Sequence, residues 1–306
     1  MSISTETNRL PSFLHIRIAP EIFASFPQTK VSFLILSTAV LSKKNQPKEM
    51  QKYLSDLKQS SVQQIVAMGV TPESYQAARV CNSWRSVFNT FNAGDDKKST
   101  IENLLRRGSA EGVKVSAGKK ADMGAISSFV DLYNSVSLST MTPMGATDIS
   151  RISQTPVGNS KTQANVELRF AHASESFIPL GKEATEVALT PTSVVYADDE
   201  KVLTGFWNWK DSKECCVPAE SARDVDGNFL PEYILLVADQ AHQDEAASAK
   251  AIQERPGDAE EAILRTQSNL ARIGGTWYAM DILSASRPEV TFDISNIAEG
   301  EVVLKG

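Results

Sequence analysis

The sequence predicts an α+β fold, in which helices pack on a mainly antiparallel sheet core. Apolar residues at helical spacing are concentrated between residues 45 and 107, and alternating segments typical of strands are concentrated between residues 160 and 240. Helices grouped first and strands later favour an antiparallel sheet over the regular alternation of a parallel one. The composition, with 42% apolar and 22% charged residues, indicates a chain able to bury a large core.

Turn residues and apolar spacing define the first elements. Short apolar segments after residue 13 end in a run over 30–36 that predicts a strand. Apolar residues three and four apart then predict a helix between Pro47 and Gly69, and a second helix over 72–91. Both helices are expected to bury one face.

Ser99-Thr-Ile-Glu102 has the spacing of a capping box, in which the Ser hydroxyl and the Glu carboxylate each satisfy a free backbone amide. A helix over 101–107 should follow and end at Gly108. The polar stretch 109–120 is rich in Gly and Lys, which is typical of an exposed, mobile loop.

The second part of the chain alternates between turns and strands. A helix is expected over 125–139, and a helical region over 242–270 is interrupted at Pro256-Gly257, where Asp258 can cap its second half. The alternating segments that predict strands are 165–170, 192–197, 202–209, 233–238, 276–283 and 290–294.

Several function classes lack support in the sequence. The longest apolar runs fall far short of a membrane span, which needs roughly 18 residues. The three cysteines and three histidines have no metal-ligand spacing, so we expect reduced thiols, no metal and no cofactor. Neither a phosphate-binding loop nor a nucleophile-elbow motif is present. We expect an intracellular, cytoplasmic protein with no membrane partner.

Charge is unevenly distributed along the chain. The net charge is −6, but residues 1–120 carry +8 and residues 121–306 carry −14. A basic first part can meet a polyanion, although lysines on solvated helix faces explain the same pattern. The candidate RNA-binding residues are Arg106, Arg107, Lys119 and Lys120.

Five ordered motifs carry a resemblance to a known family. They are Glu102-Asn-Leu-Leu-Arg-Arg107, Phe129-Val-Asp-Leu-Tyr-Asn134 with Pro143-Met-Gly-Ala-Thr-Asp148, Glu167-Leu-Arg-Phe-Ala171, Val195-Tyr-Ala-Asp-Asp199, and Trp207-Asn-Trp-Lys-Asp-Ser212. Together they resemble the free-standing B3/B4 domain proteins, which are related to the tRNA-binding and editing module of the phenylalanyl-tRNA synthetase beta subunit. The resemblance implies a B3/B4-like domain over 13–275, after a flexible N-terminus over 1–12. The segment 276–306 is then expected to be a C-terminal extension.

The resemblance also implies a site and an activity. The related editing module hydrolyses the ester of a mischarged tRNA without a covalent enzyme intermediate. Its substrate-contacting Asn is matched by Asn134, and its turn is matched by Pro143 and Asp148. The histidine of the bacterial editing site falls at Gly145, and the acidic residue that reads the tyrosine hydroxyl falls near Lys210. Two diagnostic editing groups are therefore absent.

Each candidate also has a structural interpretation. The amide of Asn134 either holds an aminoacyl ester, as the catalytic residue, or is satisfied locally. Asp131 binds an ammonium group or, as we favour, pairs with Lys or Arg. Asp148 supports the site floor or, as we favour, closes its turn. Arg169 meets a carboxylate or phosphate, or forms an ion pair with Asp198 or Asp199.

The last motif supplies the remaining candidates for substrate binding. If residues 202–209 form one strand, Trp207 and Trp209 share a face and form either a stacking platform or part of the core. Lys210 and Asp211 then point to opposite faces, and a pocket-facing Lys210 would favour an anionic group.

Three hypotheses about function follow. The first is an aminoacyl-tRNA binding protein with possible deacylase activity on mischarged tRNA. The second is an enzyme that acts on a free amino acid or an amino-acid-derived small molecule in the same pocket. The third is a non-catalytic RNA-binding module.

Overall fold

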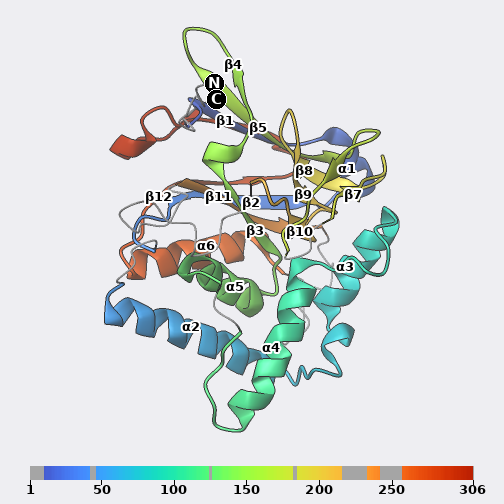
Figure 1. Cartoon of the computed structure of the whole chain (residues 1–306), viewed down its shortest axis with the longest axis vertical. Helices are drawn as coiled ribbons and strands as arrows, with labels where there is room; N and C mark the ends of the chain where they lie inside the picture. The colour runs from blue at the N-terminus through green and yellow to red at the C-terminus, as the bar shows by residue number, and fades with distance from the viewer. Residues whose placement is uncertain are drawn as a thin grey trace, which may run out of the picture.

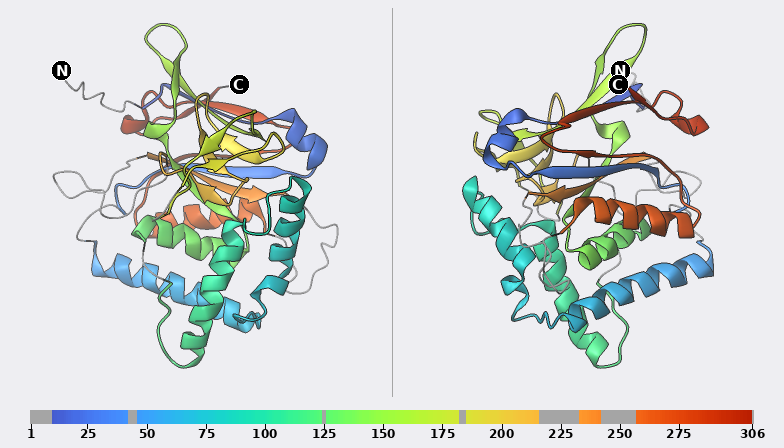
Figure 2. Two further views of the ribbon diagram at one scale, coloured as in Figure 1. Left: turned by 45° about the vertical axis from the view of Figure 1, so that its right-hand side comes forward. Right: turned by 180° about the vertical axis from the view of Figure 1, so that it is seen from behind.

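The computed structural model describes residues 10–41, 46–123, 126–181, 185–215, 233–241 and 257–305. Two sheets lie face to face, helices α5 and α6 cover the outer face of the smaller sheet, and helix α2 lies beneath them (Figure 1). Figure 2 shows the same order of layers from behind. This architecture confirms the predicted α+β class.

The larger sheet contains eight strands in the order β10-β9-β8-β5-β1-β13-β14, with β4 paired to β5. Among the pairings described for this sheet, β1 with β5 is parallel and the others are antiparallel. The bounds are β1 Phe13–Ile18, β4 Gln154–Pro156, β5 Thr162–Phe170, β8 Val194–Ala197, β9 Val202–Gly205, β10 Lys210–Asp211, β13 Glu289–Asp293 and β14 Val303–Lys305.

The smaller sheet is fully antiparallel, in the order β12-β2-β11-β3. A separate ribbon pairs β6 with β7. The bounds are β2 Lys30–Ser37, β3 Met144–Asp148, β11 Tyr233–Gln240, β12 Trp277–Leu283, β6 Ser176–Phe177 and β7 Val187–Ala188.

Strand β2 is apolar on both faces because the smaller sheet is covered on both sides. Successive side chains of a strand point to opposite faces. Phe33 and Ile35 enter the core between the two sheets, whereas Leu34 and Leu36 pack in a second core between the smaller sheet and the helices. This double burial explains the continuous apolar run in the sequence.

Six α-helices are described in the structure. Ser127 caps α5 by accepting a hydrogen bond from the Val130 amide (3.2 Å), and Asp258 caps α6 by accepting from the Glu260 and Glu261 amides. The cap at Asp258 confirms a prediction, while residues 242–256 of the expected helical region lie outside the described residues. The bounds are α1 Pro20–Ser25, α2 Lys48–Ala67, α3 Arg79–Thr90, α4 Thr100–Ser116, α5 Ser128–Thr140 and α6 Ala259–Arg272.

Helix α4 differs from its prediction at both ends. Ser99 is the residue before the helix, but its hydroxyl makes no capping bond, and the Glu102 carboxylate binds Arg85 instead. Gly108 does not end the helix, which continues to Ser116, so the expected loop over 109–120 is wrong for its first eight residues. The reason is close packing: small residues Gly108 and Gly112 face α2 and α5, and this contact outweighs the low helix propensity of glycine.

Two further predictions need correction. The expected helix over 72–91 begins only at Arg79, because residues 75–77 form a separate 3₁₀ turn. The expected strand over 202–209 ends at Gly205, since Phe206 (φ 50°) and Trp207 (φ 64°) both adopt left-handed backbone conformations. Trp207 and Trp209 therefore do not share a strand face.

The segment expected to be an extension contributes to both sheets. β12 pairs with β2 of the smaller sheet, and β13 pairs with β1 of the larger one. Both strands coincide with alternating segments identified in the sequence. Among the described residues, no helix is long and apolar enough to cross a membrane.

Candidate functional site

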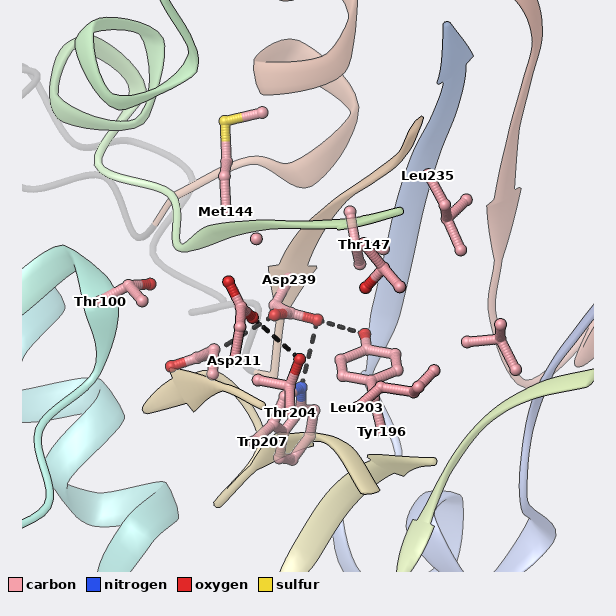
Figure 3. Close-up of a pocket in the computed structure, with 14 residues that line it drawn as sticks. Thr100, Met144, Thr147, Tyr196, Leu203, Thr204, Trp207, Asp211, Leu235 and Asp239 are labelled. Atoms are coloured by element: carbon pink, nitrogen blue, oxygen red, sulfur yellow. Dashed lines mark hydrogen bonds between the residues drawn. The ribbon is translucent and has the colours of Figure 1, made fainter. Parts of the chain in front are cut away.

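A small pocket lies between the two sheets, beside the first residue of α4 (Figure 3). Its cavity volume is about 20 Å³, which is room for about one water molecule. Three of the lining residues come from β3, three from β11, and most others from strands of the larger sheet and the turn between β9 and β10. The lining residues are Thr100, Met144, Gly145, Thr147, Val166, Tyr196, Leu203, Thr204, Trp207, Asn208, Asp211, Leu235, Val237 and Asp239.

Asp239, near the end of β11, lies at the centre of a hydrogen-bond network. Its Oδ1 accepts from the Tyr196 hydroxyl (2.5 Å) and from Trp207 Nε1 (3.2 Å), and its Oδ2 accepts from Asn208 Nδ2 (3.5 Å). Burial disfavours the charged carboxylate and raises the pKa of Asp239 to about 7, although these three donors act in the opposite direction. Asp239 can therefore exchange a proton near neutral pH.

A second buried carboxyl group, Asp211, faces the same pocket from β10. Its Oδ1 accepts a hydrogen bond from the Thr204 hydroxyl (3.0 Å), and burial raises the pKa of Asp211 to about 6. Figure 3 shows the two carboxyl groups close together. Negative charge on Asp211 makes a further, smaller contribution to the raised pKa of Asp239.

Two polar atoms on the pocket wall have no hydrogen-bond partner within the described chain. They are Asn208 Oδ1 and Thr100 Oγ1, and Asn208 as a whole is only 4% exposed. The orientation of the Asn208 amide follows from the bond that its nitrogen donates to Asp239. A buried acceptor without a donor is costly, so a water molecule or a ligand group that donates to Asn208 Oδ1 would be favoured in this pocket.

The walls of the pocket follow from strand alternation and from the turn at Trp207. Leu235, Val237 and Asp239 occupy alternate positions of β11 and therefore share the face that meets the larger sheet. The left-handed turn places the Trp207 indole in the core, edge-on to Phe26 (5.1 Å between ring centroids). Burial of this large ring offsets the strain of the turn, which is on the order of 1–3 kcal/mol for such a residue.

Comparison with known families places most of the residues that line this pocket within a recognised domain. The family model of the B3/4 domain matches residues 101–225. The chain contains a B3/4 domain. This is the domain found in the phenylalanyl-tRNA synthetase beta subunit, which supports a tRNA-related role. A comparison with curated proteins finds no match.

The B3/4 domain supplies only part of the pocket. Asp211 and Thr204 lie inside the matched residues, whereas Thr100 precedes them and β11, with Asp239, follows them. The acid pair therefore joins one carboxyl group of the B3/4 domain to one from outside the matched segment.

Three of the substrate-binding candidates line the pocket of the B3/4 domain. Gly145 and Asp211 lie opposite each other, because a Cβ atom added at Gly145 would be 3.4 Å from Asp211 Oδ1. Trp207 is the third, although it reaches the pocket from a turn rather than a strand. Trp207 is 0% exposed, which supports its interpretation as a core residue over its interpretation as part of a stacking platform.

Asn134 does not line the pocket. It lies half-buried on α5, the helix that leads into β3 and Gly145. Asp131, one turn earlier, binds Lys58 Nζ (2.7 Å), which is the ion pair that the sequence favoured. Asp148 accepts from the Ser150 amide (3.0 Å) and so closes a turn, the structural role favoured for it.

Arg169 and Lys210 also lie away from the pocket. Arg169 forms a two-pronged ion pair with Glu175 (2.9 and 2.6 Å), so its partner is neither of the aspartates considered from the sequence. Lys210 is exposed, and its Nζ lies 4.9 Å from the centroid of the Trp209 ring. Lys210 therefore does not face this pocket, while its neighbour Asp211 does.

The basic residues proposed for RNA binding lie along and beyond α4. Arg106, Lys119 and Lys120 are exposed, whereas Arg107 is half-buried and its burial lowers the pKa of the guanidinium. At 1.5 Å per residue, Ser116 is roughly 25 Å from the pocket end of the helix. Other basic side chains of the first third form ion pairs, including Lys52 with Asp56 and Lys114 with Glu111.

The sequence did not identify Asp239, Tyr196, Thr204 or Asn208 as site residues. One signal was available for Asp239: it continues the alternation of Leu235 and Val237, which puts a carboxyl group on a buried face. Tyr196 and Asn208 become site residues only because the larger sheet packs against β11, which is distant in the sequence, whereas Thr204 reaches Asp211 across the short β9-β10 hairpin. Within the described residues, no group of three or more His, Cys, Asp or Glu is placed to hold a metal ion.

Proposed function

We propose that this protein binds aminoacyl-tRNA and hydrolyses the ester bond of a mischarged tRNA. The observation that carries the proposal is a buried, partly unsatisfied polar pocket that is largely formed by the B3/4 domain. Room for about one water molecule is too little for a nucleobase, but it suits the end of an amino-acid chain. The pocket would then recognise the aminoacyl group, and the ester would lie at its mouth.

In the proposed reaction, a water oxygen attacks the ester carbonyl carbon. The bond from that carbon to the ribose oxygen breaks, the amino acid leaves as a carboxylic acid, and the ribose oxygen receives a proton. The Asn134 amide and backbone amides would hold the carbonyl and stabilise its developing negative charge, which is a large contribution in such reactions. This role for Asn134 rests on the family resemblance, because α5 covers the outer face of the smaller sheet and Asn134 does not line the pocket.

The tRNA body would follow the basic residues that lie along and beyond α4. Arg106, Lys119 and Lys120 are exposed cations along a path of roughly 25 Å from the pocket. Contacts of this kind release counterions, so binding should weaken steeply as salt rises. The overall charge of −6 makes this basic path, rather than net charge, the expected source of attraction.

Selectivity should differ from tyrosine editing. Gly145 replaces the histidine that the family resemblance implies, and the pocket is too small for an aromatic ring in its present form. Asp211, rather than Lys210, lines the pocket, together with Asp239. A small or flexible aminoacyl group is therefore the expected substrate.

The test is a panel of tRNAs, each charged with one labelled amino acid, incubated with the full chain. We expect selective ester loss that is abolished by Asn134→Ala and retained by Asn89→Ala, an exposed helical asparagine on α3 that serves as the matched control. Equal loss in both variants would remove Asn134 from the mechanism. No binding of charged or uncharged tRNA at low salt would contradict the proposal as a whole.

A second candidate is an enzyme that acts on a free amino acid or its derivative. The pocket favours it in one respect, since β11 completes the wall from outside the matched B3/4 segment. Thermal stabilisation by an amino acid without any response to tRNA would select this candidate, and a ligand at 100 times its dissociation constant should add about 2.7 kcal/mol. tRNA binding without turnover would instead select a non-catalytic RNA-binding module.

A further inference from the structure

The pocket between the sheets offers hydrogen-bond acceptors without matching donors. Asp211 and Asp239 present two carboxyl groups, and the buried Asn208 Oδ1 and Thr100 Oγ1 have no partner in the described chain. Three nearby donors are already used, since Thr204 donates to Asp211, and Tyr196 and Trp207 donate to Asp239, whereas the Thr100 hydroxyl can still donate as well as accept. A ligand that completes this set must bring donors of its own.

We propose that this pocket binds a primary ammonium group, at the end of an amine or on an amino acid. An ammonium ion has three N–H donors and no acceptor, which matches a wall of two carboxyl groups, an amide oxygen and a hydroxyl oxygen. The inference names the substrate chemistry for the proposed function and rests on that function only for the link to tRNA. Binding of the ammonium group itself requires no tRNA.

Charge supports a cation over an anion. Two carboxylates can supply two negative charges, whereas the nearby N-terminus of α4 contributes only about half a positive charge. A bound anion would lie against both acids and would be repelled. Charge-assisted hydrogen bonds from an ammonium group to carboxylates are roughly twice as strong as neutral ones.

The remaining walls favour an organic cation over a metal ion. Met144, Val166 and Leu203 line the pocket with apolar atoms, which suit the carbon attached to an amine nitrogen. A hard metal ion prefers six or more oxygen ligands and keeps part of its water shell. A cavity of about 20 Å³ leaves little room for such a shell.

Protonation adds an independent signature. Burial raises the pKa of Asp211 to about 6 and that of Asp239 to about 7, so the empty pair holds part of its protons near neutral pH. A bound cation favours the charged carboxylates and lowers both values. Binding near pH 6.5 should therefore release protons, and the measured heat should depend on the ionisation enthalpy of the buffer.

The experiment is isothermal titration of the full chain with n-butylammonium, with n-butanol as the neutral probe of equal size, and with alanine methyl ester. We expect both ammonium probes to bind about tenfold or more tightly than n-butanol, with proton release. Tighter binding of n-butylammonium would assign the site to an amine side chain, and tighter binding of the ester would assign it to an α-ammonium group. Sodium and potassium chloride at equal concentration should not compete.

Variants connect the binding to the two acids. Asp211→Asn and Asp239→Asn should each weaken n-butylammonium binding about tenfold or more. Asp281→Asn should leave n-butylammonium binding unchanged, because Asp281 lies on β12, outside the pocket, and pairs with Arg287. If Asp239→Asn fails to fold, Asp211→Asn and the proton release still decide the question.

Equal affinity for n-butanol, competition by sodium at equal concentration, or no binding of any ammonium probe at about 10 mM would overturn the inference. These outcomes are separate from the tRNA assay. Ammonium binding without tRNA binding would refute the proposed function and leave this inference standing. Ester hydrolysis by a protein that does not bind the ammonium probes would support the proposed function and overturn this inference.

Discussion

The Tyr196 hydroxyl donates a hydrogen bond to Asp239 Oδ1 across 2.5 Å and thereby joins the two sheets. Tyr196 lies on β8 of the larger sheet, and Asp239 lies on β11 of the smaller one. Trp207 Nε1 donates to the same oxygen (3.2 Å). One buried carboxyl oxygen thus receives donors from two segments of the opposite sheet, and the pocket forms around this junction.

Removing the hydroxyl in Tyr196→Phe should destabilise the fold by about 1–3 kcal/mol, because a buried carboxyl group loses its shortest hydrogen bond. The loss should be smaller at pH 5, where Asp239 is protonated and can donate elsewhere, than at pH 8. Urea unfolding at both pH values measures it. A half-buried control outside the junction is Tyr278→Phe, on β12. Equal stability of Tyr196→Phe and the native chain at pH 8 would show that the junction contributes nothing.

The acid pair should make stability fall as pH rises between about 4 and 7. The pKa values of Asp211 and Asp239 in the folded chain, about 6 and about 7, exceed the ordinary value of 3.8. In this window the folded state holds protons that the unfolded state has lost, so each group lowers the unfolding free energy by at most about 1.4 kcal/mol per pH unit. Asp148 adds to the same trend, because its burial also raises its pKa.

The measurement is the free energy of unfolding at several pH values for the native chain and Asp239→Asn. The variant should show a shallower slope between pH 4 and 7, since one titrating group is gone. Glu175 and Asp293 have lowered pKa values and act at the acidic end of this window, but both are present in the two proteins and so do not mask the difference between them. Parallel curves for the two proteins would contradict the assignment of a raised pKa to Asp239.

The sequence predicted those parts of the fold that depend on local pattern. The apolar run that became β2 and the cap at Asp258 are signals contained within a few residues. The predicted helix end at Gly108 was wrong, because packing against Leu138 and Ile65, which lie far away in the sequence, decides whether the helix continues. Trp207 misled for a similar reason, because burial of its ring supports a backbone conformation that aromatic residues seldom adopt.

The site was predictable only where a motif touched it. Gly145 and Asp211 were identified through the family resemblance, and both line the pocket. Asp239 lies outside the matched B3/4 segment, and its partners Tyr196 and Trp207 come from the other sheet. Such a network depends on how two sheets are placed face to face, which no spacing within one strand encodes.

The ion pair between Arg85 and Glu102 should respond unequally to removal of its two partners. Glu102 is 1% exposed and accepts two bonds from Arg85 (3.0 and 2.6 Å), whereas the Arg85 side chain is 38% exposed. Within the described part of the chain, Arg85→Met leaves the buried carboxylate with one ion-pair partner, Lys98 at 3.9 Å, and should cost about 3 kcal/mol or more. Glu102→Gln leaves an arginine that can reach water, so it should cost less.

Urea unfolding of the two single variants tests this asymmetry. A double variant, Arg85→Met with Glu102→Gln, should recover part of the loss seen in Arg85→Met, because no buried charge is left unpaired. Equal losses in the two single variants would mean that the environment of Glu102 is more polar than its burial indicates.

Three glycines provide a graded test of packing around α4 and the pocket. A Cβ atom added at Gly108 would lie 3.5 Å from Leu138, an ordinary contact, so Gly108→Ala should stabilise the chain by about 0.5–1 kcal/mol through helix propensity. At Gly112 the same atom would lie 2.9 Å from Val66 Cγ2, and the required shift should cancel most of that gain.

The third position, Gly205, ends β9 beside the turn that carries Trp207. A Cβ atom there would lie 2.1 Å from the Phe177 ring. Gly205→Ala should therefore destabilise the chain by roughly 1–3 kcal/mol or more, the range typical of overpacking. Unfolding free energies of the three variants should therefore rank Gly108→Ala above Gly112→Ala and both above Gly205→Ala. Phe177→Leu removes the clashing ring atoms, so it should restore part of the stability lost in Gly205→Ala. If Phe177→Leu leaves that loss of stability unchanged, the strain lies instead in the backbone of the Trp207 turn.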